Sequence, residues 1–153
     1  MNGLIKSLCA AGAALMLSTT AVAESFSFTS TGEGTGGVSI PMANGATAGA
    51  GSSAGTTNWT WASGKKSTST YVCYSMTDRA GELFALRGMC ESTQDGEVVS
   101  SVMFGCNYLN EERTETNCVG GLIGRAGAFE GKTGTISWHG KDGTSNGAGH
   151  WND

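Results

Sequence analysis

The sequence predicts an all-β protein that forms a single small antiparallel β-barrel of about eight strands. Three observations lead to this fold class. The chain contains 25 glycines but only one proline, Pro41, and glycine is costly inside helices but useful in turns, bulges and barrel corners. No stretch of a dozen residues shows the apolar spacing of an amphipathic helix. Short runs that alternate apolar and polar residues recur between turn residues, as in half-buried strands.

The first 23 residues predict a cleavable signal peptide. Lys6 precedes an apolar run over residues 8–17, and the small residues Ala21 and Ala23 come just before Glu24, where signal peptidase admits only short side chains. About ten apolar residues fall short of the roughly 20 that span a bilayer. We therefore expect cleavage between Ala23 and Glu24, a periplasmic or secreted protein, and no transmembrane segment in the mature chain.

The remaining residues have the length of one domain. Residues 24–57 are expected to form a strand over 24–31, in which Phe26 and Phe28 alternate with polar residues, followed by a Gly/Ala/Ser-rich loop over 32–57. Residues 58–153 are expected to form the barrel body. Its strands are predicted at 58–62, 69–77, 83–92, 97–108, 114–120, 133–139 and 147–152.

The alternation in strands 83–92 and 97–108 predicts their register. The even-numbered residues are largely apolar in both strands, so their side chains should point into the barrel. Paired residues point to the same side of the sheet, so an even-numbered residue must pair with an even-numbered one, and the two numbers must add up to an even number. A two-residue Asp95-Gly96 turn would give an odd sum. We therefore predict a three-residue loop, Gln94-Asp95-Gly96, that pairs Phe84 with Cys106 and Leu86 with Phe104. The aromatic residues that would then line a cavity are Trp59, Phe84, Phe104 and Tyr108.

Four cysteines follow the signal peptide: Cys73, Cys90, Cys106 and Cys118. An even number of cysteines in an exported chain predicts two disulfides. The 16, 15 and 11 residues between them differ from the close pairs typical of zinc sites.

The predicted strand register assigns the first disulfide. A loop at residues 111–113 places Cys106 opposite Cys118, and Cys73–Cys90 then follows by elimination. Val72, Tyr74 and Met76 look like the inward face of their strand, which would turn Cys73 outward. The second pairing would therefore need a β-bulge.

Composition and motifs exclude several functions. Lys6 is one of 9 basic residues, so the mature chain keeps 8 against 13 acidic ones, and this lacks the basic footprint of a nucleic-acid-binding protein. The letters Gly32-x-Gly34-x-x-Gly37 match the dinucleotide fingerprint, but no helix follows to bind a pyrophosphate. Asn58-Trp59-Thr60 spells a glycosylation sequon, yet Trp59 and Trp61 are better interpreted as one face of a strand.

The two histidines are the remaining candidates for chemistry. On adjacent strands, His139 and His150 would oppose each other and, with Asp142 or Asp153, offer a metal or acid–base site. Each histidine adjoins a tryptophan, Trp138 or Trp151, so alternation sends the histidines to the opposite, outer face. We assign no catalytic, cofactor-binding or metal-binding residue, and the sequence favours a protein that is not an enzyme.

The most distinctive motif is Gly-x-Phe-x-Gly-x-x-Gly at residues 127–134, followed by Ile136-Ser137-Trp138. Over residues 120–138, and in general layout over 58–152, the chain resembles the calycin-like barrels of the allene oxide cyclase and dirigent type. It is also similar to small uncharacterised periplasmic proteins of bacteria. The resemblance implies a calycin-like barrel. The plant cyclases use polar residues within their cavity, and none aligns with a residue of this chain.

The leading hypothesis is therefore an exported, non-catalytic barrel that binds a small apolar ligand or a protein partner in the cell envelope, without a cofactor. One alternative is an envelope inhibitor of the lysozyme-inhibitor type, whose first cysteine strand is similar to Tyr71-Val72-Cys73. The other is a cyclase-like isomerase, which requires a polar cluster inside the barrel.

Overall fold

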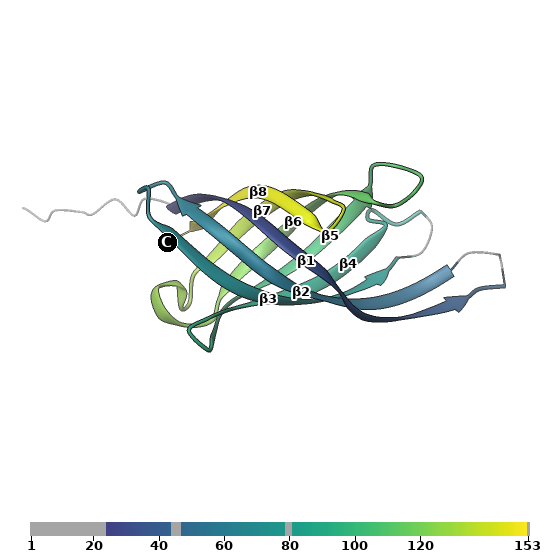
Figure 1. Cartoon of the computed structure of the whole chain (residues 1–153), viewed down its shortest axis with the longest axis horizontal. Coiled ribbons are helices and arrows are strands. Elements are labelled where there is room, and N and C mark those ends of the chain that lie inside the picture. The colour runs from purple at the N-terminus through teal and green to yellow at the C-terminus, as the bar shows by residue number, and fades with distance from the viewer. Residues whose placement is uncertain (1–23, 44–46, 79–80, 153) are drawn as a thin grey trace, which may run out of the picture.

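The computed structural model describes residues 24–43, 47–78 and 81–152. It contains one closed antiparallel barrel in which each strand pairs with the next along the chain and β8 pairs with β1 (Figure 1). The all-β, eight-stranded barrel predicted from the sequence is confirmed. The elements are β1 (Glu24–Pro41), β2 (Thr47–Trp61), β3 (Lys66–Thr77), β4 (Leu86–Gln94), β5 (Glu97–Tyr108), β6 (Glu115–Gly124), the 3₁₀ turn η1 (Gly127–Phe129), β7 (Thr133–Lys141) and β8 (Thr144–Asn152). The predicted signal peptide and Asp153 lie outside the described residues.

Aromatic side chains fill one half of the barrel. Phe129, from the turn η1, lies between Trp61 and Trp151, with ring centroids 5.3 and 4.9 Å from its own. This glycine-flanked turn is the distinctive motif of the sequence, and it places Phe129 against the core. Around the three rings pack Phe26, Phe28, Trp59, Leu122 and Ile136. This half of the interior is therefore a packed core, as expected for a barrel of this strand number.

The hollow left among these side chains is very small. It measures about 20 Å³ and is bordered by Trp59, Trp61, Ser69, Ser100 and Leu122, among others. A volume of this size holds about one water molecule. A drug-sized ligand occupies several hundred Å³, so this hollow offers it no room.

Residues 32–41 and 47–57 form strands rather than the predicted loop. β1 and β2 stay paired almost to their ends, interrupted by one bulge at Thr35, while β1 leaves β8 after Thr31. Beyond that point β1 pairs with β2 alone, and the two strands extend past the barrel (Figure 1). This extension is called here the arm and is defined as residues 34–41 and 47–53, of which residues 50–53 also pair with β3. The loop prediction was wrong because small residues carry no apolar alternation, whereas the backbone alone can form the ladder.

Two positions of this segment require glycine because the Tyr71 side chain lies close to their backbone. Gly32 and Gly55 face each other across the β1–β2 ladder, and a Cβ atom at either would collide with the Tyr71 hydroxyl. The glycine-rich fingerprint thus lies in a strand, where Gly32 makes room for a tyrosine. Burial in this position raises the pKa of Tyr71.

The predicted β4–β5 loop and register were wrong. Asp95 and Gly96 form a two-residue turn, both with positive φ (52° and 84°), between the paired Gln94 and Glu97. This turn type matches the twist of the flanking strands. A bulge that leaves Val99 unpaired then restores the even register. As a result Leu86, and not Phe84, pairs with Cys106, while Phe104 faces Gly88.

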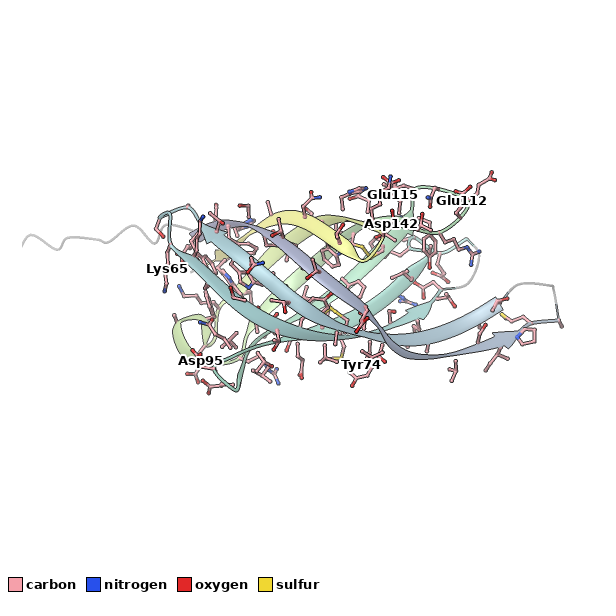
Figure 2. The ribbon with its side chains drawn as sticks, viewed as in Figure 1. Lys65, Tyr74, Asp95, Glu112, Glu115 and Asp142 are labelled. Atoms are coloured by element: carbon pink, nitrogen blue, oxygen red, sulfur yellow. A yellow bond between two sulfur atoms is a disulfide. The ribbon has the colours of Figure 1, made fainter. Side chains whose placement is uncertain are left out.

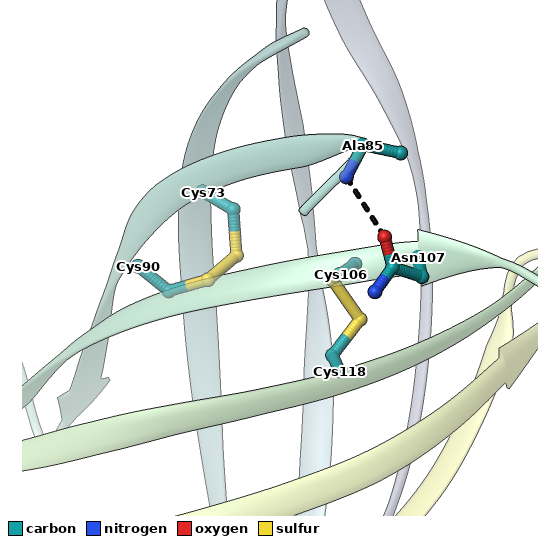
Figure 3. Close-up of a disulfide and its surroundings, with 6 residues drawn as sticks. All are labelled: Cys73, Ala85, Cys90, Cys106, Asn107 and Cys118. Carbon is teal, nitrogen blue, oxygen red and sulfur yellow. Dashed lines mark hydrogen bonds between the residues drawn. A yellow bond between two sulfur atoms is a disulfide. The ribbon is translucent and has the colours of Figure 1, made fainter. Parts of the chain in front are cut away.

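Both predicted disulfides are present. Cys106 pairs with Cys118 across β5–β6 with a Cα–Cα distance of 4.1 Å, as the hairpin register predicted. Cys73 pairs with Cys90 across β3–β4 at 4.0 Å (Figure 3). The two disulfides join neighbouring strand pairs of the same sheet.

The β3–β4 ladder runs without a bulge, so the expected obstacle to the Cys73–Cys90 bond does not exist. The predicted orientation of β3 was reversed. Val72, Tyr74 and Met76 point outward and are 43, 62 and 58% exposed. Tyr71, Cys73 and Ser75 therefore lie on the inner face. The disulfide to Cys90 and the packing of the Tyr71 ring hold β3 in this orientation.

Candidate functional site

The most unusual surface of the molecule is apolar. Tyr74 on β3 pairs with Met89 on β4, which pairs with Met103 on β5. Met76 and Val119 lie in the adjoining row, on either side of Arg87 and Gly105. These five residues, Tyr74, Met76, Met89, Met103 and Val119, are 39–62% exposed and define the outer apolar face. Adjacent exposed apolar residues on a monomer mark interaction sites more often than isolated ones do.

Phe84 extends this face instead of lining a cavity. A Cβ atom built at Gly105 would collide with the Phe84 ring, and Gly105 shares its outward row with Arg87 and Val119. The prediction of an inward Phe84 was therefore wrong. Its strand begins only at Leu86, and the preceding segment folds back over the outside of β5.

Three polar contacts hold that segment in place. Asn107 Oδ1 accepts a hydrogen bond from the Ala85 N–H at 2.9 Å (Figure 3), and its Nδ2 donates to the Leu83 carbonyl at 3.2 Å. Arg87 Nε lies 2.7 Å from the Asp78 carboxylate, whose side chain is 5% exposed, and this contact raises the pKa of Arg87. Phe84 is thus fixed beside the outer apolar face by groups on β4, on β5 and in the connection between β3 and β4.

The disulfides lie directly behind the same surface. Cys73 adjoins Tyr74, Cys90 adjoins Met89 and Cys118 adjoins Val119 in sequence, so the cystines occupy the inner side of the strands that carry the exposed residues. Cross-strand covalent links restrict how far these strands can separate. The outer apolar face is therefore preorganised, which reduces the entropy lost on binding.

The other predicted lining residues belong to the packed interior. The Trp59 indole donates to Ser69 Oγ at 2.9 Å and borders the small hollow. Phe104 packs edge-on against Trp138, with ring centroids 5.3 Å apart. Tyr108 lies under the Arg113 guanidinium, 5.5 Å from its ring centroid. The structure brings Trp59, Phe104 and Tyr108 to the inner face without a shared cavity.

The histidines do not face each other. His139 pairs with Asn146 and His150 with Thr135, so they occupy different rows of the β7–β8 ladder. His139 Nε2 lies 2.7 Å from Glu115 Oε1, and His150 Nδ1 lies 3.2 Å from the Thr135 hydroxyl. Within residues 24–43, 47–78 and 81–152, no three His, Cys, Asp or Glu side chains are grouped to hold a metal ion.

The hydrogen bond from His139, helped by Lys141, holds the pKa of the Glu115 carboxyl below its usual value. A carboxyl with a depressed pKa stabilises the fold above its unfolded-state pKa and loses that contribution as the pH falls through its folded-state pKa. We predict that Glu115→Gln lowers the Tm slightly at pH 7 and that the difference from wild type shrinks to nothing in acid. Thermal unfolding at pH 7 and pH 3 tests this. Glu112→Gln, at an exposed site nearby, is the control, and an equal Tm deficit at both pH values would contradict the assignment.

Charge is unevenly distributed between the two ends of the barrel. Glu112, Glu115 and Asp142 gather at the end from which the arm extends, whereas Lys65 and Asp95 lie at the other end (Figure 2). The described connections at the arm end carry Asp78, Glu82, Glu111, Glu112 and Asp142, against Arg113 in a connection and Arg87 and Lys141 on the adjoining strands. Of these acidic residues, Glu82 lies in the segment that carries Phe84, beside the outer apolar face, while Arg87 lies within the row of that face.

None of the helical structure in the described part of the chain is long and apolar enough to cross a membrane. Comparison of the sequence and structure with protein-family models, curated proteins and solved structures gave no match. The resemblance to calycin-like barrels stays a prediction, and function must be inferred from the site itself.

Proposed function

We propose that this chain is an exported, non-catalytic interaction protein of the cell envelope that binds a basic protein partner through its outer apolar face. The observation that carries the proposal is the row Tyr74–Met89–Met103, exposed on a sheet that two disulfides brace from behind. Methionine and tyrosine are enriched in protein interfaces, and the flexible thioether of methionine adapts to a partner's shape.

The packed aromatic half of the interior favours binding on the outer face over a small apolar ligand held among the core aromatic rings. The hollow of about 20 Å³ is too small for such a ligand. Aromatic rings occupy the inner face where the cyclase-like alternative would need a polar cluster. The apolar surface instead lies outside the barrel, on residues that are accessible without opening the fold.

The charge distribution favours a basic partner. The chain carries a net charge of −4, and Glu82 lies in the connection that carries Phe84, beside the outer apolar face. Complementary charge at the rim of an interface accelerates association and selects among partners. Enzymes such as lysozyme, which are strongly basic, therefore fit the proposal better than acidic proteins do.

Site-specific photo-crosslinking in the source cell tests the interface. A photo-reactive residue in place of Met103 should form an adduct with one defined protein, whereas the same residue in place of Thr29 should not. Thr29 is an exposed, outward-facing residue of β1, four strands away round the barrel. Adducts of equal yield at both positions, or adducts with lipid alone at Met103, would overturn the proposal.

The partner identified in this way is then titrated against purified protein by calorimetry. We predict that Met103→Asp weakens binding by about 10- to 100-fold, because it places an unpaired charge in an apolar contact. Thr29→Asp should leave the affinity unchanged. Unfolding curves of both variants control for stability, and equal affinity of Met103→Asp and wild type would exclude this surface.

The inhibitor alternative is tested separately. Purified mature protein is added to lysozymes in a cell-wall lysis assay, and inhibition that is lost in Met103→Asp but kept in Thr29→Asp would identify the partner class. Binding without inhibition would favour an adaptor over an inhibitor.

A further inference from the structure

The arm has an unpartnered strand edge. β8 pairs with β1 only as far as Thr31, and the last contact on that side is the Gly32 N–H donating to the Gly143 carbonyl at 2.9 Å. Among the described residues, no strand adjoins the β8-facing edge of β1 from Glu33 to Pro41. A free edge of this kind is a template for adding another strand.

Contacts on the neighbouring strand show which backbone groups face the free edge. The Gly49 N–H donates to Thr77 Oγ1 at 2.7 Å, and the Thr77 hydroxyl donates to the Gly49 carbonyl, so both groups of Gly49 point toward β3. Gly49 is the partner of Ser39. Because the groups of such a pair point away from each other, the N–H and C=O of Ser39 face the free edge. Gly37, two residues earlier and paired with Gly51, faces the same way.

We propose that two copies of this chain associate by antiparallel pairing of their β1 edges, centred on Val38. Thr35 is bulged, and Pro41 has no N–H to donate, so the regular part of the edge is bounded to Gly36–Ile40. Val38 is the middle residue of that segment. Pairing about this centre places Gly37 of each copy opposite Ser39 of the other, and each such pair exchanges both hydrogen bonds.

The side chains favour a second copy as the occupant. Val38 and Ile40 are 68 and 63% exposed. In the proposed register Val38 meets Val38 of the second copy in the closely spaced type of pair, where side chains contact most directly. An interface of this kind uses the same patch on both copies, and its two-fold symmetry limits the assembly to a dimer.

Charge also limits where two copies can approach. The chain is acidic overall, but residues 34–41 carry no charged side chain. The neutral arm is thus a place where like chains can meet with little repulsion, and salt should strengthen the dimer by screening the remaining charges. Binding of a basic partner to the outer apolar face should weaken with salt, so salt dependence separates the two interactions.

Sedimentation equilibrium of the mature, oxidised protein over a range of concentrations and salt tests the proposal. Ser39→Pro removes a donor from the free edge and leaves the β1–β2 ladder intact, because that N–H does not face β2. We expect wild type and the control Ser39→Ala to dimerise, and Ser39→Pro to associate at least about tenfold more weakly.

Hydrogen exchange supplies a second readout that does not depend on the proline variant. The amides of Gly37 and Ser39 should gain protection as the wild-type concentration rises, whereas those of Val38 should change less. A monomeric wild type at all concentrations, or equal association of Ser39→Pro and Ser39→Ala, would overturn the inference. Neither result would affect crosslinking at Met103, so the two proposals fail independently.

Discussion

Removing both disulfides is expected to lower the free energy of unfolding by about 6 kcal/mol. The bonds close separate loops with sequence separations of 17 and 12 residues. Each bond restricts the unfolded chain and thereby raises the free energy of unfolding by about 3 kcal/mol. Since the loops do not overlap, the two contributions should add. A loss of this size approaches the whole stability of many single domains, so the fully reduced protein should be unfolded or nearly so at 37 °C.

Denaturant unfolding of the oxidised and the reduced, alkylated protein measures this loss. Paired substitutions, Cys73→Ser with Cys90→Ser and Cys106→Ser with Cys118→Ser, serve as controls that remove one bond at a time, and each pair should show about half the effect. Equal midpoints for oxidised and reduced protein would refute the prediction. So would a single bond that accounts for the entire difference.

The second large effect is expected at the aromatic stack that closes one end of the barrel. Trp151 is 4% exposed, and its ring stacks on Phe129 with centroids 4.9 Å apart. Trp151→Ala should therefore destabilise the fold by about 4 kcal/mol, through lost burial and the cavity it leaves. Leu109→Ala, at a residue that is 55% exposed, should change stability by less than about 0.5 kcal/mol.

Chemical unfolding monitored by circular dichroism compares these two variants. If Trp151→Ala and Leu109→Ala had equal midpoints, the barrel end would not depend on the stack. A double substitution of Trp151 and Phe129 should cost less than the sum of the two single ones, because the two rings contact each other.

Local hairpin chemistry explains what could be predicted from the sequence. The loop at residues 111–113 sets the register of β5 and β6, and so it correctly placed Cys106 opposite Cys118. The glycine content and the absence of helical periodicity correctly indicated the barrel. The bulge beside Ser92 could not be foreseen, because an unpaired residue such as Val99 has no distinctive sequence, and the Asp95-Gly96 turn was misjudged as a consequence.

The predicted orientation of β3 was wrong because its apolar residues lie on the outer face. Apolar alternation predicts the buried face of a strand, yet Tyr74 and Met76 are exposed while Ser75 lies on the inner face. Local rules are expected to fail where a surface is used for binding. The same reversal hid the outer apolar face, whose Met89 and Met103 come together only through the register of three strands.

The barrel closes by pairing its first strand, β1, with its last strand, β8. Glu24, the residue after the predicted cleavage site, pairs with Trp151, and contacts so distant in sequence form slowly because a long chain segment must first be ordered. A chain that is made available from its N-terminus onward holds β1 without its β8 neighbour until residues 144–152 follow. During that interval the incomplete sheet has two unpaired edge strands, and chaperones have a defined period in which to protect it.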